Sequence, residues 1–390
     1  MILVVLILIL GALFVLLGVR NSWRYALQRI GGAVLVLILV TFGTTVLIRQ
    51  VPGEPCEIAL GTAATPEAVA ECVDDQGLDE GVVAQYLTWS QQVLIEGDLG
   101  YAFYKNQEPL SETIQQRLPR TVMLFFYSQL IALAIAVPLG IWAAYQAGRP
   151  SKGIPIWILP IIVGGIYIYG EFITDWLFTS VLTLAFLLPI LIFNLFRGGR
   201  GGDTTVNFLA FGLLSLPVFV LGVILRYAFA EERNWFSLAG YVPITDNVIE
   251  HLKSIWVPAL VLGLAAAPVY LRLLRADMIQ NLQQDFVSVA KAKGMSNTHI
   301  LLRHVLRPST VTLMTVLGLN IAQLVNGALV VEYIFDFDGM GSYLIEAIYR
   351  QEFFAVQTLV ALVAIIFVVT NMVIDVFYSV VDPRVRAEAA

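Results

Sequence analysis

Long apolar runs separated by short polar segments dominate this sequence of 390 residues. A helix needs roughly 20 mostly apolar residues to cross the hydrocarbon core of a membrane, with a range of about 17–25. Nine runs reach that range, and each predicts one membrane-spanning helix. We therefore predict an all-α, polytopic membrane protein whose helices pack as a bundle. The predicted spans are residues 1–19, 30–48, 121–146, 154–170, 176–196, 206–229, 256–274, 309–334 and 355–380.

The composition agrees with this class of protein. Hydrophobic residues make up 58% of the chain and charged residues 13%, whereas a soluble domain has about 25% charged residues. The first run, residues 1–19, carries no charge and is followed by Arg20, Arg24 and Arg29. A cleaved signal peptide has a basic start and a cleavage site of small residues, and this run lacks both. We expect an uncleaved N-terminal span rather than a signal peptide.

Lysine and arginine residues in the connecting loops predict the orientation, because cytoplasmic loops carry an excess of them. If residues 20–29 lie in the cytoplasm, alternation of the spans places 15 of the 23 basic residues on that side. We therefore predict an N-terminus outside, a C-terminus in the cytoplasm, and a cytoplasmic location for the segment 276–308.

The largest segment placed outside, residues 49–120, is acidic and contains both cysteines of the chain. Between residues 50 and 118 there are 12 acidic residues against one lysine and one arginine. Cys56 and Cys72 are compatible with a disulfide in an oxidising compartment, and two half-buried free thiols are the alternative. Apolar residues at helical spacing predict short amphipathic helices in this segment.

The sequence lacks the motifs that would indicate an enzyme. There is no G-x-x-x-x-G-K-[ST] phosphate loop, no G-x-S-x-G motif and no H-E-x-x-H zinc motif. The stretch RGGRGGD at residues 197–203 lacks the lysine of a phosphate loop and predicts a flexible basic turn. His299 and His304 are five residues apart, which does not place them on one helix face. We expect this chain to have no catalytic site, no metal site and no bound cofactor.

One predicted span carries a row of uncharged polar residues. Asn320, Gln323 and Asn326 recur at three-residue spacing in the span 309–334 and form an arc on one side of the helix. Polar side chains are costly in lipid, so the arc should face protein or water. A wall of a water-filled translocation path and a set of interhelical hydrogen bonds explain it equally well.

Three charged residues lie near the ends of spans. Asp375 is close to the inner end of the last span, where we expect it to anchor an arginine of an inner loop in a structural role. Arg226 and Glu332 lie near outer ends, and we expect their side chains to extend toward the membrane surface.

The stretch DFVSVAKAKGMSNTHILLRHVLRP, residues 285–308, is basic and rich in helix-forming residues. Residues 280–293 predict one helix, Gly294 predicts its end, and residues 298–306 predict a second short helix. The small side chains of Ala290 and Ala292 would keep the bend slim enough to enter a cleft on another protein. An interfacial helix resting on anionic lipid is the alternative.

Several motifs of this chain occur in the same order in one family. The sequence A-K-A-K-G-M followed by R-H-V-L-R resembles the "EAA" coupling loop of bacterial ABC-importer permeases of the dipeptide/oligopeptide/nickel type. Ser288 stands where that loop has its glutamate, and the run 1–19 and the pair of spans within 148–205 are additions. The other similar stretches are LIRQVPGEPC (47–56), GDLGYAF (97–103), RLPRTVML (117–124), SLPVFVLG (215–222), EYIFDFDGMGSYL (332–344) and DVFYSVVDPRVR (375–386).

The resemblance implies a six-helix core of the ABC type I importer class, formed by residues 20–48, 121–147 and 206–386. Within it, the loop 276–308 would dock on an ATPase subunit, and Asn320, Gln323 and Asn326 would line the path. The closing motif supplies Asp375, Asp382, Pro383 and Arg384 as structural residues. The residues expected to make the ATPase contact are Asp285, Ala290, Lys291, Ala292, Lys293, Gly294, Met295 and Ser296.

The resemblance also implies partners. These are a second, related permease chain, two ABC ATPase subunits that bind ATP and Mg, and an extracytoplasmic binding protein that delivers short peptides. The location would be the bacterial inner membrane, and nucleic acid is not expected as a partner. An ion-gradient-driven secondary carrier is the alternative function, although such carriers show internal repeats and intramembrane ionisable relays that we do not find.

Overall fold

The computed structural model describes residues 2–20, 22–50, 55–61, 64–75, 79, 81–102, 108–146, 216–231 and 240–381. The predicted spans 154–170 and 176–196, and the first ten residues of the span 206–229, lie outside these residues. The described chain divides into two compact units. The first comprises Met1–Tyr127, Gly222–Ala259 and Gly318–Ala390, and the second comprises Ser128–Leu221 and Leu260–Leu317.

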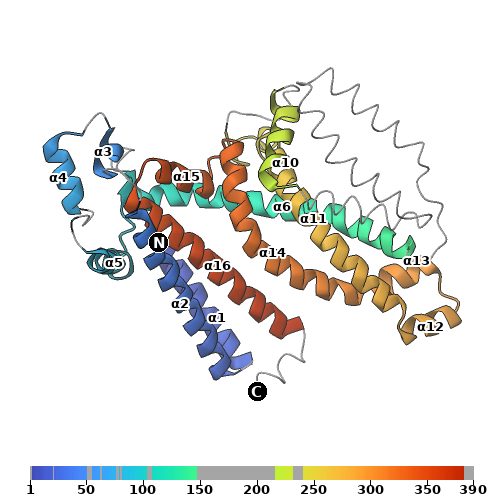
Figure 1. The fold of residues 1–390 in the computed structure, drawn as a ribbon. Coiled ribbons are helices and arrows are strands. Elements are labelled where there is room, and N and C mark those ends of the chain that lie inside the picture. Colours follow the sequence, from blue (N-terminus) through green and yellow to red (C-terminus); the bar gives the residue numbers. More distant parts are fainter. Residues whose placement is uncertain are drawn as a thin grey trace. The chain divides into compact units, whose positions relative to one another are not determined.

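Helices account for nearly all of the described structure, as the sequence predicted (Figure 1). Four of them are long and apolar enough to cross a membrane, over Trp23–Ile48, Leu110–Tyr145, Val248–Leu282 and Phe353–Val376. Shorter apolar helical stretches cover Leu8–Val19 and Val218–Phe229. The helices of the predicted spans are α1 (Ile2–Arg20), α2 (Trp23–Ile48), α6 (Leu110–Gln146), α10 (Val218–Arg226) with the π-helical segment η4 (Tyr227–Glu231), α11 (Val248–Leu282), α14 (Leu306–Ile334) and α16 (Phe353–Val381).

In the first unit, α1 and α2 lie against α16 (Figure 1). The contact is apolar and includes Leu17 of α1, Ala26 of α2 and Met372 of α16, all buried. The outer side of α2 remains exposed and rich in valine, leucine and isoleucine. A helix that is apolar on its exposed side is typical of contact with lipid.

Helix α6 begins at Leu110, well before the predicted span at residue 121. Its first turns are amphipathic: Leu110 and Ile114 are buried against α15 (Met340–Tyr349) and α16. Arg117 and Arg120, which interrupt the apolar run, reach Asp338 at 3.7 and 3.3 Å. The charge that ended the predicted span is therefore paired, and the helix extends through it.

The acidic segment 49–120 forms short helices, as expected, and a strand pair that the sequence did not predict. Cys56 and Cys72 are joined by a disulfide that links α3 to α4. Strands β1 and β2 pair antiparallel, with Tyr101 opposite Pro109. The elements are α3 (Pro55–Leu60), α4 (Pro66–Asp75), α5 (Val82–Gln91), the π-helical segment η2 (Gln92–Glu96), β1 (Tyr101–Ala102) and β2 (Glu108–Pro109).

The second unit contains parts of α6, α11 and α14 together with the short helices that follow α11. These are α12 (Asp285–Ala292), α13 (Asn297–His299) and the π-helical segment η5 (Ile300–Val305). Within this unit the Tyr270 hydroxyl donates to Gln129 Oε1 at 2.6 Å, which joins α11 to α6. Asn281 Nδ2 donates to Ser309 Oγ at 2.9 Å, which joins the end of α11 to the start of α14. Both bonds fix the helices that carry α12.

Candidate coupling and translocation sites

The basic segment begins with a break that the sequence did not predict. Helix α11 ends at Leu282, and Gln284 has an extended backbone before α12 begins at Asp285. The predicted single helix over residues 280–293 is therefore wrong at residues 283–284. Asp285 lies in the first turn of α12, where a carboxylate is favoured by the helix dipole. Asp285 therefore stabilises the start of a new helix. Helix propensity alone does not show whether one helix continues through residues 283–284 or a second one begins after them.

Helix α12 ends in a Schellman motif, in which backbone N–H groups beyond the helix satisfy its last carbonyls. Gly294 N donates to the Lys291 carbonyl at 2.9 Å, and Met295 N donates to the Ala290 carbonyl at 3.2 Å. Gly294 has φ of 77°, in the left-handed region that side chains disfavour. The bend predicted at Gly294 is thus a specific hydrogen-bonded turn.

After the bend, Ser296 caps the next helix, with its Oγ accepting from His299 N at 3.4 Å. The helical run continues through α13 and η5 into α14 at Leu306. Pro308 does not end this run: the π-helical segment η5 ends three residues before it, and α14 continues through it to Ile334. Two short helical pieces joined by a turn therefore connect α11 to α14.

The exposed surface of the bend differs from the predicted one. Ala290 is buried, so its small side chain packs within the second unit. Phe286 and Val289 are instead exposed, by 41% and 53%. They lie three residues apart on the side of α12 next to the one that buries Val287 and Ala290. The remaining predicted contact residues Asp285, Lys291, Ala292, Lys293, Gly294 and Ser296 are exposed, and Met295 is half-buried.

Sequence reasoning missed Phe286 and Val289. The available signal was the number of apolar residues, because Phe286, Val287, Val289 and Ala290 together cover more of a short helix than a single buried side needs.

Helix α14 contains the whole predicted polar arc. Asn320 is half-buried and belongs to the described residues. The side chains of Gln323 and Asn326 lie outside the described part of the structure. The helical backbone keeps the three positions on one side of α14, so the arc stays a prediction about the path.

Glu332, in the last turn of α14, is fully buried. Its Oε1 accepts from Thr121 Oγ1 of α6 at 2.6 Å. Its Oε2 accepts from the backbone N–H groups of Gly341 and Ser342 at 2.6 and 3.2 Å. These groups belong to the first turn of α15, so the side chain of Glu332, which lies in α14, caps the N-terminus of the next helix. The expectation that Glu332 extends toward the membrane surface is wrong.

The space around this carboxylate requires glycine. A Cβ atom on Gly341 would lie 2.5 Å from the Cα of Leu329 and 2.9 Å from Glu332 Oε2. Thr121 Oγ1 also accepts from Met340 N at 2.9 Å, so α6 and α14 together satisfy the first turn of α15. The stretch 332–344 therefore folds as one junction, which we call the Glu332 junction.

Arginine and tyrosine side chains surround the Glu332 junction. Arg226 donates to the Ile334 carbonyl, and Arg117 lies over the Tyr343 ring at 4.9 Å. Arg226 thus binds the carboxyl end of α14, where a cation is favoured, instead of extending to the surface as expected. Tyr241 packs against Phe337 at 5.3 Å, and burial raises the pKa of its hydroxyl although Arg120 opposes the shift. Tyr241 consequently stays protonated at neutral pH.

At the other end of the first unit, Asp375 of α16 lies 3.0 Å from Arg29 of α2. Arg29 also donates to the Tyr25 hydroxyl at 3.1 Å. Asp375 thus contacts an arginine near the start of α2, the kind of partner the sequence suggested. Asp382, Pro383 and Arg384 lie outside the described residues.

The described residues contain no cluster of three or more histidine, cysteine or acidic side chains that could hold a metal ion. The arrangement offers an exposed, partly apolar surface on α12, a helix with a polar arc and a hydrogen-bonded junction at Glu332.

The sequence matches two family descriptions. Residues 136–387 match the family described as "Binding-protein-dependent transport system inner membrane component", and residues 22–125 match the N-terminal region of such membrane components. A putative peptide transport system permease protein of Brucella abortus is 30% identical over 360 residues, covering 92% of this chain and 98% of the relative. The dipeptide transport system permease protein DppB of Escherichia coli is 28% identical, covering 93% and 98%. The oligopeptide transport system permease protein AppB of Bacillus subtilis is 25% identical, covering 93% and 99%.

Proposed function

Since this chain belongs to the family of binding-protein-dependent transport system inner membrane components, it is a multi-pass permease subunit of an ABC importer, and we propose how it works with its partners. The relatives named above are peptide, dipeptide and oligopeptide permeases, which supports short peptides as the cargo. ATP hydrolysis belongs to separate ATPase subunits, in keeping with a chain that has no phosphate loop.

The proposed assembly pairs this chain with a second, related permease and two ABC ATPase subunits that bind ATP and Mg. An extracytoplasmic binding protein would deliver the peptide. In this arrangement the N-terminus lies outside, the C-terminus lies in the cytoplasm, and the acidic segment 49–120 faces the binding protein. Complementary charge on that protein would speed the encounter.

The observation that carries the proposal is the bend after α12. Phe286 and Val289 are apolar and exposed, and Lys293 follows them at the capped end of the helix. A rigid short helix with an apolar pair and a basic end suits insertion into a groove on another protein. We propose that these residues, with Ala292, form the surface that contacts the ATPase, while Ala290 packs α12 onto η5.

Crosslinking tests this contact directly. Because both native cysteines are in the disulfide, a single cysteine introduced at Val289 gives a unique reactive thiol. In the assembled transporter we expect it to crosslink to an ATPase subunit. A cysteine at Leu39, on the exposed apolar side of α2, is the matched control. We expect it to react only with reagents dissolved in the lipid and not to crosslink to an ATPase subunit. Crosslinks from position 289 to lipid or solvent alone would contradict the docking role.

Transport measurements separate this function from a secondary carrier. Peptide uptake into proteoliposomes should require ATP on the side of α12 and should continue when the proton gradient is collapsed. Uptake that persists without ATP, driven by a proton gradient, would refute an ABC importer.

A further inference from the structure

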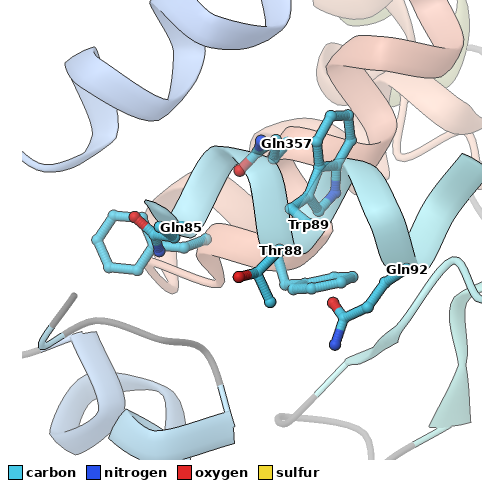
Figure 2. A pocket seen from close by; sticks show the side chains of 7 residues that line it. Gln85, Thr88, Trp89, Gln92 and Gln357 are labelled. Atoms are coloured by element: carbon cyan, nitrogen blue, oxygen red, sulfur yellow. The ribbon is translucent and has the colours of Figure 1, made fainter. Parts of the chain in front are cut away.

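Helix α5, the first residue of η2 and the start of α16 line a small pocket of about 20 Å³ with both polar and apolar walls. Gln85 and Thr88 of α5 and Gln92 of η2 follow one another at helical spacing, with Thr88 between the two amides in Figure 2. The aromatic rings of Trp89, Phe353 and Phe354 complete the walls together with the amide of Gln357.

Gln357 brings an unused hydrogen-bond donor to this pocket. Its side chain is only 4% exposed, and its Nε2 has no partner among the described residues. A buried amide nitrogen without a partner costs roughly 1–3 kcal/mol, so an occupant that offers an acceptor would be stabilised there. Gln85 is less available, because its Oε1 already accepts from Arg49 Nε at 2.7 Å. The pocket thus matches an acceptor group such as a carbonyl oxygen.

A second pocket adjoins the first and is apolar. Trp89 lines both pockets and is held in place by a hydrogen bond from its Nε1 to Thr358 Oγ1 at 3.2 Å. At 1.5 Å of rise per residue, Ile365 lies roughly 18 Å along α16 from Phe353, well inside the span that begins there. The other lining residues are Val93, Leu99, Ile114, Thr358, Ala361 and Leu362.

The outward side of α5 is an independent sign of membrane contact. Val83 and Leu87 lie on it, Leu94 continues it in η2, and each is at least 60% exposed. The opposite side of the helix buries Gln85, Trp89 and Val93. A helix that is apolar on its exposed side and carries a tryptophan fits the boundary between lipid and water.

We propose that α5, η2 and the first three turns of α16 bind a diacyl phospholipid from the surrounding membrane. A glycerol ester carbonyl accepts a hydrogen bond from Gln357 Nε2 in the first pocket. One acyl chain lies along the apolar residues beside Trp89 and places only a small part of its length in the second pocket, whose volume is also about 20 Å³. No charged side chain lines either pocket, so the matching polar group is the neutral ester rather than the phosphate. An amphiphile fits both pockets at once, whereas a soluble peptide would leave the apolar one without a partner.

Photolabelling of the assembled transporter in nanodiscs tests the site. The nanodiscs would contain phosphatidylethanolamine with a diazirine on one acyl chain, and labelled residues would be mapped by mass spectrometry. We expect labelling of Val93 and residues 361–365 to exceed that of exposed apolar residues on α2 by fivefold or more. Equal labelling at both places would overturn the proposal.

Two variants sharpen the result. Ala361→Phe fills the apolar pocket and should abolish the excess labelling, while Gln357→Leu removes the amide at similar volume and should reduce it about fivefold, the loss of one hydrogen bond. Leu39→Phe on the exposed side of α2 is the control and should leave it unchanged. If Ala361→Phe does not assemble, Gln357→Leu decides alone, and unchanged labelling in it would refute the carbonyl contact.

A cysteine at Leu87 that crosslinks to another subunit would show that protein, not lipid, covers α5, and would also overturn the proposal.

Discussion

The bend after α12 can be tested by a graded series at Gly294. At φ of 77° the residue occupies a conformation that costs an ordinary side chain about 1–2 kcal/mol. No atom lies within 4 Å of a Cβ built there, so Gly294→Ala introduces this backbone strain and no clash. Gly294→Asn is the matched control, because asparagine tolerates the left-handed conformation and should introduce less backbone strain than alanine.

Proline removes the motif altogether. Its ring fixes φ near −65°, and it has no N–H to donate to the Lys291 carbonyl, so the bond at 2.9 Å is lost. The bond from Met295 N to the Ala290 carbonyl depends on the same turn and is lost with it. Two hydrogen bonds at about 1 kcal/mol each, together with the dihedral mismatch, amount to roughly 3 kcal/mol of local destabilisation. A helix of eight residues is only marginally stable, so we expect this loss to unfold the end of α12.

Peptide uptake and ATPase activity in proteoliposomes would measure the effect. We expect peptide uptake to decrease in the order Gly, Asn, Ala, Pro at position 294. Uptake by Gly294→Pro should be at least tenfold lower than that of the unchanged protein, because a tenfold change corresponds to only about 1.4 kcal/mol. Membrane insertion, followed by protease protection, should be normal in all four, because Gly294 lies outside the helices that qualify as spans. Full uptake in Gly294→Pro would refute the reasoning, since the bend could then be dispensed with.

The remaining predictions concern the Glu332 junction and the disulfide. Glu332→Ala should lower the free energy of unfolding by about 3–5 kcal/mol, because the N–H groups of Gly341 and Ser342 lose their acceptor. Glu332→Gln keeps one oxygen for them and should lose less than about 1.5 kcal/mol; equal thermal stability of both variants in detergent would contradict the capping role. Cys56 and Cys72, 16 residues apart, should be alkylated only after reduction, as a mass shift, and reduction should make the acidic segment protease-sensitive because closing such a loop is worth about 3 kcal/mol. Alkylation without a reductant would exclude the bond.

Some of this structure follows from local chemistry and was predictable. The turn at Gly294 depends on a glycine placed directly after a short helix, and the last residue of α2 and both ends of α14 and α16 follow from the apolar runs to within three residues. Helix α2 begins at Trp23, seven residues before the predicted span. The class of protein follows from the same runs, and the family motifs in order then indicate an ABC importer permease.

Two of the misses share a physical cause, which is that hydropathy cannot show whether a charge is paired. Arg117 and Arg120 ended the predicted span, although their pairing with Asp338 lets α6 start at Leu110. Glu332 was expected at the surface, although the N-terminus of α15 surrounds its carboxylate. The small residue Gly341, nine positions after this acid, was the available signal, because backbone N–H groups can approach a buried carboxylate only where no side chain intervenes.

Helix α14 gives the two sites a physical relation. It is one continuous hydrogen-bonded helix from Leu306 to Ile334, so the docking segment precedes its first turn and Glu332 occupies its last. The polar arc at residues 320–326 lies between these ends. A helix transmits displacement along its length unless it bends, because each residue is bonded to the next turn. The proposed ATPase contact at α12 lies in the second unit, whereas Glu332 and the start of α15 lie in the first. Loss of the Gly294 turn should consequently uncouple ATP hydrolysis from uptake in a folded protein, whereas loss of Glu332 should weaken the protein itself.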